Sequence, residues 1–183
     1  VRTLFWRCGR KMYMLARMDV PNFPQTNGEY NILDKVISGR SANDVVLFDI
    51  GAHEGNWSFH ALNELKHGKD KFRIFCFEPS DLMFEVMRKR FAKIDAITAS
   101  QVALSDRSGM AKFYQFNDFS GISSLNWISD ARPSDVQVQT IDEVVGLNDL
   151  SKILFIKSDT EGHDFNVMLG AEMSLKLGKI DFW

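Results

Sequence analysis

Three acidic residues stand at or just beyond the ends of short apolar runs. Asp49 follows the run at residues 45–48, Glu78 follows residues 72–77, and Asp159 comes shortly after a third run. Each run has the length and apolar character of a strand buried on both faces of a sheet. Because the carboxyl ends of parallel strands meet at one edge, we expect these carboxylates to surround a common ligand crevice.

The turn that follows Asp49 indicates the kind of ligand. It reads Asp-Ile-Gly-Ala-His-Glu-Gly, with glycines at 51 and 55 and a second acid, Glu54. A dinucleotide site has the pattern G-x-G-x-x-G, whose backbone N–H groups bind a pyrophosphate. Two acidic side chains fit poorly beside that anion. Acids suit a cation with an amino group and a sulfonium, which favours S-adenosyl-L-methionine over the alternative of a plain strand-helix turn. The turn residues that we expect to bind this cofactor are Asp49, Gly51, Ala52, His53 and Gly55.

Glu78 has the position expected of a ribose-binding acid. It lies 23 residues beyond Gly55, close to the spacing of about 20 residues at which an acid binds a ribose diol. A carboxylate accepts hydrogen bonds from both ribose hydroxyls. The alternative is a surface acid that precedes a helix.

The segment Asp159-Thr160-Glu161-Gly162-His163 supplies candidate general bases. A hydroxyl acceptor must lose a proton, and Asp159, Glu161 and His163 are the candidates to remove it. Asp159 is the first choice because it comes soonest after its strand. Its alternative roles are to cap the next helix or to pair with Lys157. His53 and His163 could join Asp159 as metal ligands, but isolated loop histidines seldom do so, and we predict no metal.

The intervening segments predict the elements that position these residues. Helical patterns over 29–38, 56–66 and 80–91 alternate with apolar runs, which indicates right-handed βαβ units around a parallel sheet. Residues 110–116 alternate as in a hairpin or an added edge strand. Residues 117–127 have no clear period and are either a loop over an acceptor pocket or an ordinary surface loop.

Composition limits the class of protein. The chain has 183 residues, 45% of them hydrophobic and 25% charged, which fits one soluble globular domain. A net charge of −2 gives no basic field for nucleic acid. Two cysteines form no disulfide framework, so a reducing, cytoplasmic setting is the default. No run reaches transmembrane length or has the pattern of a signal peptide, so we predict no stable membrane insertion.

Residues 1–18 hold five basic residues and no acid. Their apolar residues recur at near-helical spacing, which is typical either of a basic amphipathic helix on a membrane surface or of a helix packed on the domain. We expect the second, and therefore divide the chain into residues 1–44, a helical segment packed on the core, and residues 45–183, the catalytic domain. The chain begins at Val1 and stops inside an apolar run, so we expect it to be a fragment.

Taken together, these motifs resemble the FkbM family of S-adenosylmethionine-dependent methyltransferases, from about Asn27 to the C-terminus. The ordered series carries the resemblance, above all Asp-x-Glu-Gly after the fourth strand. The resembling segments are residues 46–55, Phe77-Glu78-Pro79, Ala103-Leu104-Ser105-Asp106 with Gly109, Gly121-Ile122-Ser123-Ser124-Leu125, Thr140-Ile141-Asp142 and residues 156–162.

The resemblance implies a class I methyltransferase: a three-layer, Rossmann-like α/β fold with a mostly parallel sheet. The expected reaction is O-methylation of a hydroxyl on a sugar, a lipid or a secondary metabolite. Within it, Asp49 would hold the methionine amino end, directly or through water, Glu78 the ribose, and Ala103 would lie near the adenine.

The chain departs from the family pattern at two positions and at its end. Family members commonly carry Asn at the position of His53 and Ile at that of Ser158, both near the expected ligand. The family's sheet normally continues into an antiparallel hairpin, whereas this chain stops in or after its fifth strand, without those C-terminal strands. A non-catalytic cofactor-binding or scaffold module and a nicotinamide-dependent oxidoreductase are the alternative functions, and the sequence predicts no oligomeric state.

Overall fold

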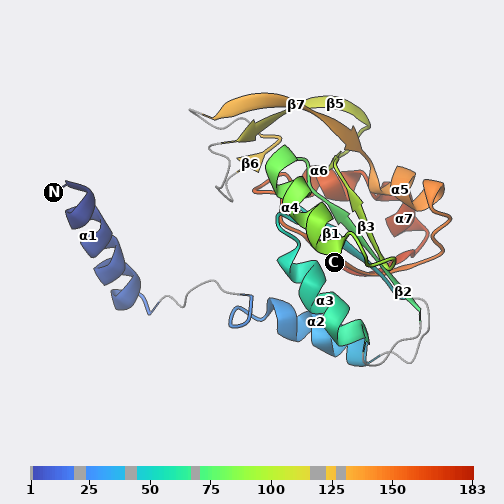
Figure 1. Ribbon diagram of the computed structural model, residues 1–183, viewed down its shortest axis with the longest axis horizontal. Helices are drawn as coiled ribbons and strands as arrows, with labels where there is room; N and C mark the ends of the chain where they lie inside the picture. Colours follow the sequence, from blue (N-terminus) through green and yellow to red (C-terminus); the bar gives the residue numbers. More distant parts are fainter. Residues whose placement is uncertain (1, 19–23, 40–44, 67–70, 116–122, 127–130) are drawn as a thin grey trace.

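A computed structural model describes residues 2–18, 24–39, 45–66, 71–115, 123–126 and 131–183 (Figure 1). Its core is a five-stranded sheet in the order β3-β2-β1-β8-β9, in which every neighbouring pair is parallel. The strands are β1 (Val45–Ile50), β2 (Phe72–Phe77), β3 (Ile97–Ser100), β8 (Ile153–Ser158) and β9 (Ile180–Phe182). The predicted parallel α/β sheet is therefore confirmed.

Helices cover both faces of this sheet and make three layers. On one face, α2 (Glu29–Ser38), α3 (Asn56–Lys66) and α4 (Asp81–Phe91) pack through residues such as Leu33, Leu62 and Met87. The other face packs against α5 (Ile141–Leu147) and α6 (Asp164–Leu169) through Ile141 and Val167, and α7 (Glu172–Lys176) follows α6. Each face thus buries its own apolar cluster.

A second sheet lies beside the first and differs from the sequence prediction. Its order is β4-β7-β5-β6, with β4 (Ala103–Leu104), β5 (Gly109–Gln115), β6 (Ser123–Ser124) and β7 (Arg132–Gln139). The predicted strand at residues 110–116 forms as β5, which pairs antiparallel with β6 and β7 and so belongs to this separate sheet. The first half of β7 is polar and exposed, so it has no apolar alternation by which the sequence could reveal it.

Two glycines shape the turn between β1 and α3. Gly51 has a φ of 71°, and a Cβ there would lie 2.1 Å from the backbone oxygen of Asp159. Gly55 has a φ of 76°, and a Cβ there would lie 2.5 Å from Cε2 of Phe91. Only glycine combines this backbone conformation with such close approach. Gly51 therefore lets the turns after β1 and β8 meet, and Gly55 lets α3 begin against α4.

The N-terminal segment divides into two helices with different surroundings. Helix α2 packs on the domain, with Leu33 and Ile37 buried. Helix α1 (Arg2–Ala16) stands apart from the rest of the chain in Figure 1, and its Phe5 and Met12 are more than 70% exposed. The division of the chain at residue 44 stays a prediction.

The described helices include none that is both long enough and apolar enough to cross a membrane.

Candidate active site

A pocket of about 300 Å³ opens at the carboxyl edge of the central sheet. Its wall combines the β1–α3 turn, the end of β2, the β8–α6 turn, the start of α2 and three strands of the second sheet. This is the position expected for a ligand site in an open α/β sheet. The predicted site residues that line it are Gly51, Ala52, His53, Glu78, Ala103, Asp159, Glu161 and His163.

Glu78 is a buried carboxylate held in a fixed orientation. Its Oε2 accepts a hydrogen bond from the backbone N–H of His53 at 2.8 Å, and its Oε1 accepts one from the backbone N–H of Ser80 at 2.9 Å. Burial raises the pKa of Glu78, while the two backbone hydrogen bonds oppose that rise. Each oxygen keeps a second lone pair, so the carboxylate can still accept hydrogen bonds from a ligand diol.

Asp49 is not among the residues that line the pocket, and its expected role at the methionine amino end, directly or through water, stays a prediction. Its side chain is completely buried, and its Oδ2 accepts a hydrogen bond from Ser58 Oγ at 2.7 Å. Its Oδ1 lies 3.3 Å from Nζ of Lys157. The physical reason is that β1 continues to Ile50, which places Asp49 inside the strand rather than beyond it.

Lys157 stands between Asp49 and the pocket. Its Nζ also donates a hydrogen bond to the carbonyl oxygen of Gly51 at 3.2 Å, and Lys157 itself lines the pocket. Burial lowers the pKa of the ammonium, but the carboxylates of Asp49 and Asp159 outweigh it and raise the pKa above its ordinary value. Lys157 therefore stays charged and ties the Gly51 turn to Asp49.

Gly55 is also not among the residues that line the pocket, and its role in cofactor binding stays a prediction. Its open side faces Phe91 and Met87 of α4. Helix packing by itself requires a glycine here, because the space that a side chain would fill is already occupied by Phe91.

The Asp159–Gly162 turn presents two carboxylates at the pocket. Asp159 and Glu161 are both exposed and both line it. Partial burial and the neighbouring carboxylates Asp159 and Asp164 raise the pKa of Glu161.

Neither alternative role of Asp159 is seen in the part of the chain that the structure describes. No side chain of the described residues caps the N-terminus of α6; Asp164 instead holds the preceding turn, because its Oδ1 accepts hydrogen bonds from Ser158 Oγ at 2.6 Å and from the backbone N–H of Thr160 at 3.1 Å. The ion pair of Lys157 is with Asp49.

His163 connects two parts of the site. It is buried, and its Nε2 lies 2.9 Å from Ser105 Oγ, which in turn donates a hydrogen bond to Asp106 Oδ1. Since the Ser105 proton points to Asp106, we assign the His163 Nε2 proton to Ser105. Burial lowers the pKa of His163, although Asp106 and Asp164 oppose this. The neutral His163 ring donates its Nε2 proton to Ser105 and thereby holds the β8–α6 turn against that residue. A ring held in this hydrogen bond is poorly placed to remove a substrate proton.

Several site residues were missed or underrated by the sequence reasoning. Tyr30 lines the pocket and stacks on His60 with ring centroids 3.9 Å apart, and Trp57 lines it from the first turn of α3. Lys157 was considered only as a partner of Asp159. The sequence could have indicated Ser58 and Trp57, because they lie in the first turn of the helix that follows the glycines. It holds no pattern that would predict the stacking of Tyr30 on His60.

A group of potential metal ligands lies outside this pocket. The ligand atoms of Asp34, His60 and Glu64 are all within 4.8 Å of one another on α2 and α3. His60 Nε2 already lies 2.8 Å from Asp34 Oδ1, a contact that satisfies both groups within the protein. We therefore assign no metal to it.

Comparison with known proteins gives consistent matches. Residues 49–182 match the family described as "Methyltransferase FkbM domain". The "2-O-methyltransferase NoeI" of Sinorhizobium fredii (strain NBRC 101917 / NGR234) is 26% identical over 157 residues, covering 77% of this chain and 63% of NoeI. The crystal structure of methyltransferase FkbM from Methylobacillus flagellatus KT matches with a TM-score of 0.50 and 17% identity, over 78% of this chain and 34% of that one, which supports the fold alone. The chain thus spans about a third to two thirds of the length of these proteins.

The lowered pKa of His163 predicts a specific pH dependence of stability. The folded chain binds the His163 proton less tightly than the unfolded chain, so the contribution of His163 to stability is complete above the ordinary value of 6.5. This contribution to stability is lost as the pH falls below 6.5 toward the lowered pKa of His163 in the folded chain. Urea unfolding between about pH 7 and pH 5 should therefore show a larger loss of stability in the wild-type chain than in His163→Gln. Parallel curves for the two proteins would contradict the assignment.

Proposed function

Because the chain belongs to the FkbM methyltransferase family, we propose that it uses S-adenosyl-L-methionine to methylate a hydroxyl oxygen of a small molecule or glycan. The acceptor class that we propose is a sugar, a lipid or a secondary metabolite. The observation that carries the proposal is Glu78, a buried carboxylate held by two backbone N–H groups at the wall of the pocket beside the glycine turn. The name of NoeI, a 2-O-methyltransferase, supports oxygen as the acceptor atom.

The residues present fit the cofactor. Glu78 retains free lone pairs for a ribose diol. Ala103 lies in the pocket wall with Val102, Leu104 and Phe113, a set of apolar side chains suited to a purine. The backbone of Gly51, Ala52 and His53 would hold the methionine end. Asp49 would support that end from behind, through Lys157. When bound, the cofactor supplies an electrophilic methyl group on a sulfonium.

The role of the protein in this reaction is to align the acceptor, exclude water and remove a proton. We assign proton removal to the carboxylate of Asp159, with Glu161 as the second candidate, because both are at the pocket while neither caps the helix. His163, the third predicted base, becomes a positioning residue that holds this turn through Ser105. Tyr30 and the start of α2 face the same pocket and would contact the acceptor.

We also propose a cytoplasmic location. The two cysteines are free, and Cys76 is buried beside Ser58 in the core, where its role is packing. This usage is typical of proteins in reducing compartments.

The ribose role of Glu78 is tested by calorimetric titration with S-adenosylhomocysteine. Hydrogen bonds to a charged group contribute about 1.5–3 kcal/mol, so Glu78→Ala should weaken binding by roughly ten- to a hundredfold. Glu85→Ala, which removes an exposed acid of α4, is the matched control and should bind as the wild type does. Equal affinity of all three proteins would remove the ribose role, and saturable binding of a nicotinamide nucleotide instead would favour an oxidoreductase.

The role of Asp159 is tested by turnover. Transfer of labelled methyl groups to a panel of sugars, lipids and small metabolites should fall by about 10²- to 10⁴-fold in Asp159→Asn, because general base catalysis contributes that much. Affinity for S-adenosylhomocysteine should stay within about threefold, since the carboxylate acts on the acceptor. Asp135→Asn in β7 is the control. Unchanged turnover in Asp159→Asn would exclude it as the base, and turnover by no protein on any acceptor would favour the non-catalytic module.

A further inference from the structure

Helix α1 differs in charge from the remainder of the chain. Residues 1–18 of the chain, which include α1, contain no acid and five basic residues: Arg2, Arg7, Arg10, Lys11 and Arg17. The remaining residues hold 17 Lys and Arg against 24 Asp and Glu, a formal charge of −7. Positive charge is therefore concentrated on one short segment of an otherwise acidic protein.

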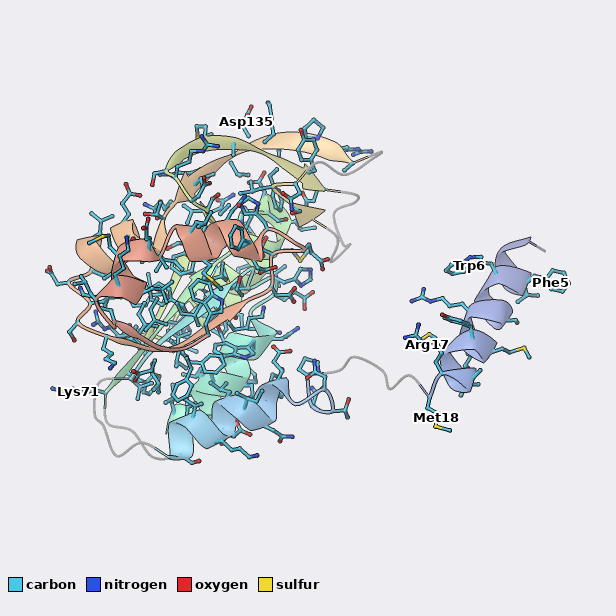
Figure 2. The ribbon with its side chains drawn as sticks, turned by 180° about the vertical axis from the view of Figure 1, so that it is seen from behind. Phe5, Trp6, Arg17, Met18, Lys71 and Asp135 are labelled. Carbon is cyan, nitrogen blue, oxygen red and sulfur yellow. The ribbon has the colours of Figure 1, made fainter. Side chains whose placement is uncertain are left out.

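The same helix exposes an apolar face. Leu4, Phe5, Met12 and Leu15 recur at spacings that place them on one side of the helix, and their exposed fractions are 65%, 73%, 71% and 71%. Figure 2 shows Phe5 and Trp6 of α1 well away from the rest of the protein. In a folded chain such a surface indicates a site of contact with another body.

Two aromatic side chains of α1 are paired with its basic residues. The guanidinium of Arg10 lies 5.5 Å from the ring centre of Trp6, and that of Arg17 lies 5.4 Å from the ring centre of Tyr13. Trp6 and Tyr13 are also exposed. Trp and Tyr beside Arg are the residues that favour the boundary between lipid headgroups and acyl chains.

We propose that α1 docks the protein on the surface of an anionic membrane. Its basic residues would contact lipid phosphates, and the face formed by Leu4, Phe5, Met12 and Leu15 would enter the acyl boundary. The helix has 15 residues, about 22 Å at 1.5 Å per residue, and so lies on a bilayer rather than across its core of about 30 Å.

Charge complementarity selects the anionic lipid surface. A bilayer that contains acidic lipids attracts a polybasic helix over roughly a Debye length, and it repels the acidic remainder of the chain, which leaves α1 as the contact. An acidic protein surface would match the charge of α1 but would leave its apolar face uncovered unless it also offered an apolar groove. This inference does not depend on the proposed methyl transfer.

The test is co-sedimentation of the whole chain with vesicles. Vesicles of phosphatidylcholine with about 30 mol% phosphatidylglycerol should retain the protein at low salt, and pure phosphatidylcholine should retain at least tenfold less. Raising the salt to about 0.5 M should weaken the binding to anionic vesicles. Equal binding to both vesicles, or binding to neither, would overturn the proposal, as would formation of dimers in place of vesicle binding.

Variants locate the contact. A triple variant should lower the partition coefficient of the protein onto anionic vesicles about tenfold or more. It combines Arg10→Gln, Lys11→Gln and Arg17→Gln. The matched control combines Lys89→Gln, Lys93→Gln and Arg107→Gln, which changes the net charge equally at exposed positions of the domain and should not lower binding. Phe5→Ser with Leu15→Ser should also weaken binding while the charge stays constant. Equal loss in the control and the α1 variant would overturn the assignment to α1.

Discussion

The ion pair between Lys157 and Asp49 is the contact on which the geometry of the site depends. The two residues are directly opposite each other in the register of β8 and β1, and their side chains meet with Nζ 3.3 Å from Oδ1. Ser58 Oγ satisfies the other oxygen of Asp49, and the carbonyl of Gly51 accepts a second bond from Lys157. A buried charge pair of this kind is tolerated only when its remaining donors and acceptors have partners.

This contact determines how the two turns at the carboxyl edge meet. Lys157 links β8 to the Gly51 turn, and the missing side chain of Gly51 lets that turn approach the backbone of Asp159. The backbone N–H of Asp159 donates to the carbonyl of Ile50 at 3.0 Å, which brings the two turns together a second time. The wall that we propose binds the cofactor and the turn that carries the proposed base are therefore held together by these contacts.

The sequence predicted which residues line the pocket better than it predicted the packing around them. The apolar runs and the glycines located the pocket edge, because strand and turn chemistry is local. The burial of Asp49 could not be predicted, since it depends on where β1 ends and on a lysine more than a hundred residues away. The packing role of Gly55 could not be predicted for a similar reason, because its neighbour Phe91 belongs to α4 and no local pattern links the two residues. The second sheet was missed because β4 and β6 have two residues each and gain their structure from long-range pairing.

The most direct test of this account is the coupling between Lys157 and Asp49 in urea unfolding. Lys157→Met leaves the Asp49 carboxylate buried without a counter-charge and should lower the free energy of unfolding by about 3–5 kcal/mol. Combining it with Asp49→Asn removes that charge, so the double variant should recover part of the loss. The central role of the pair would be contradicted if the effects of the two substitutions on the free energy of unfolding simply added. It would also be contradicted if the Lys157→Met protein were as stable as the wild type.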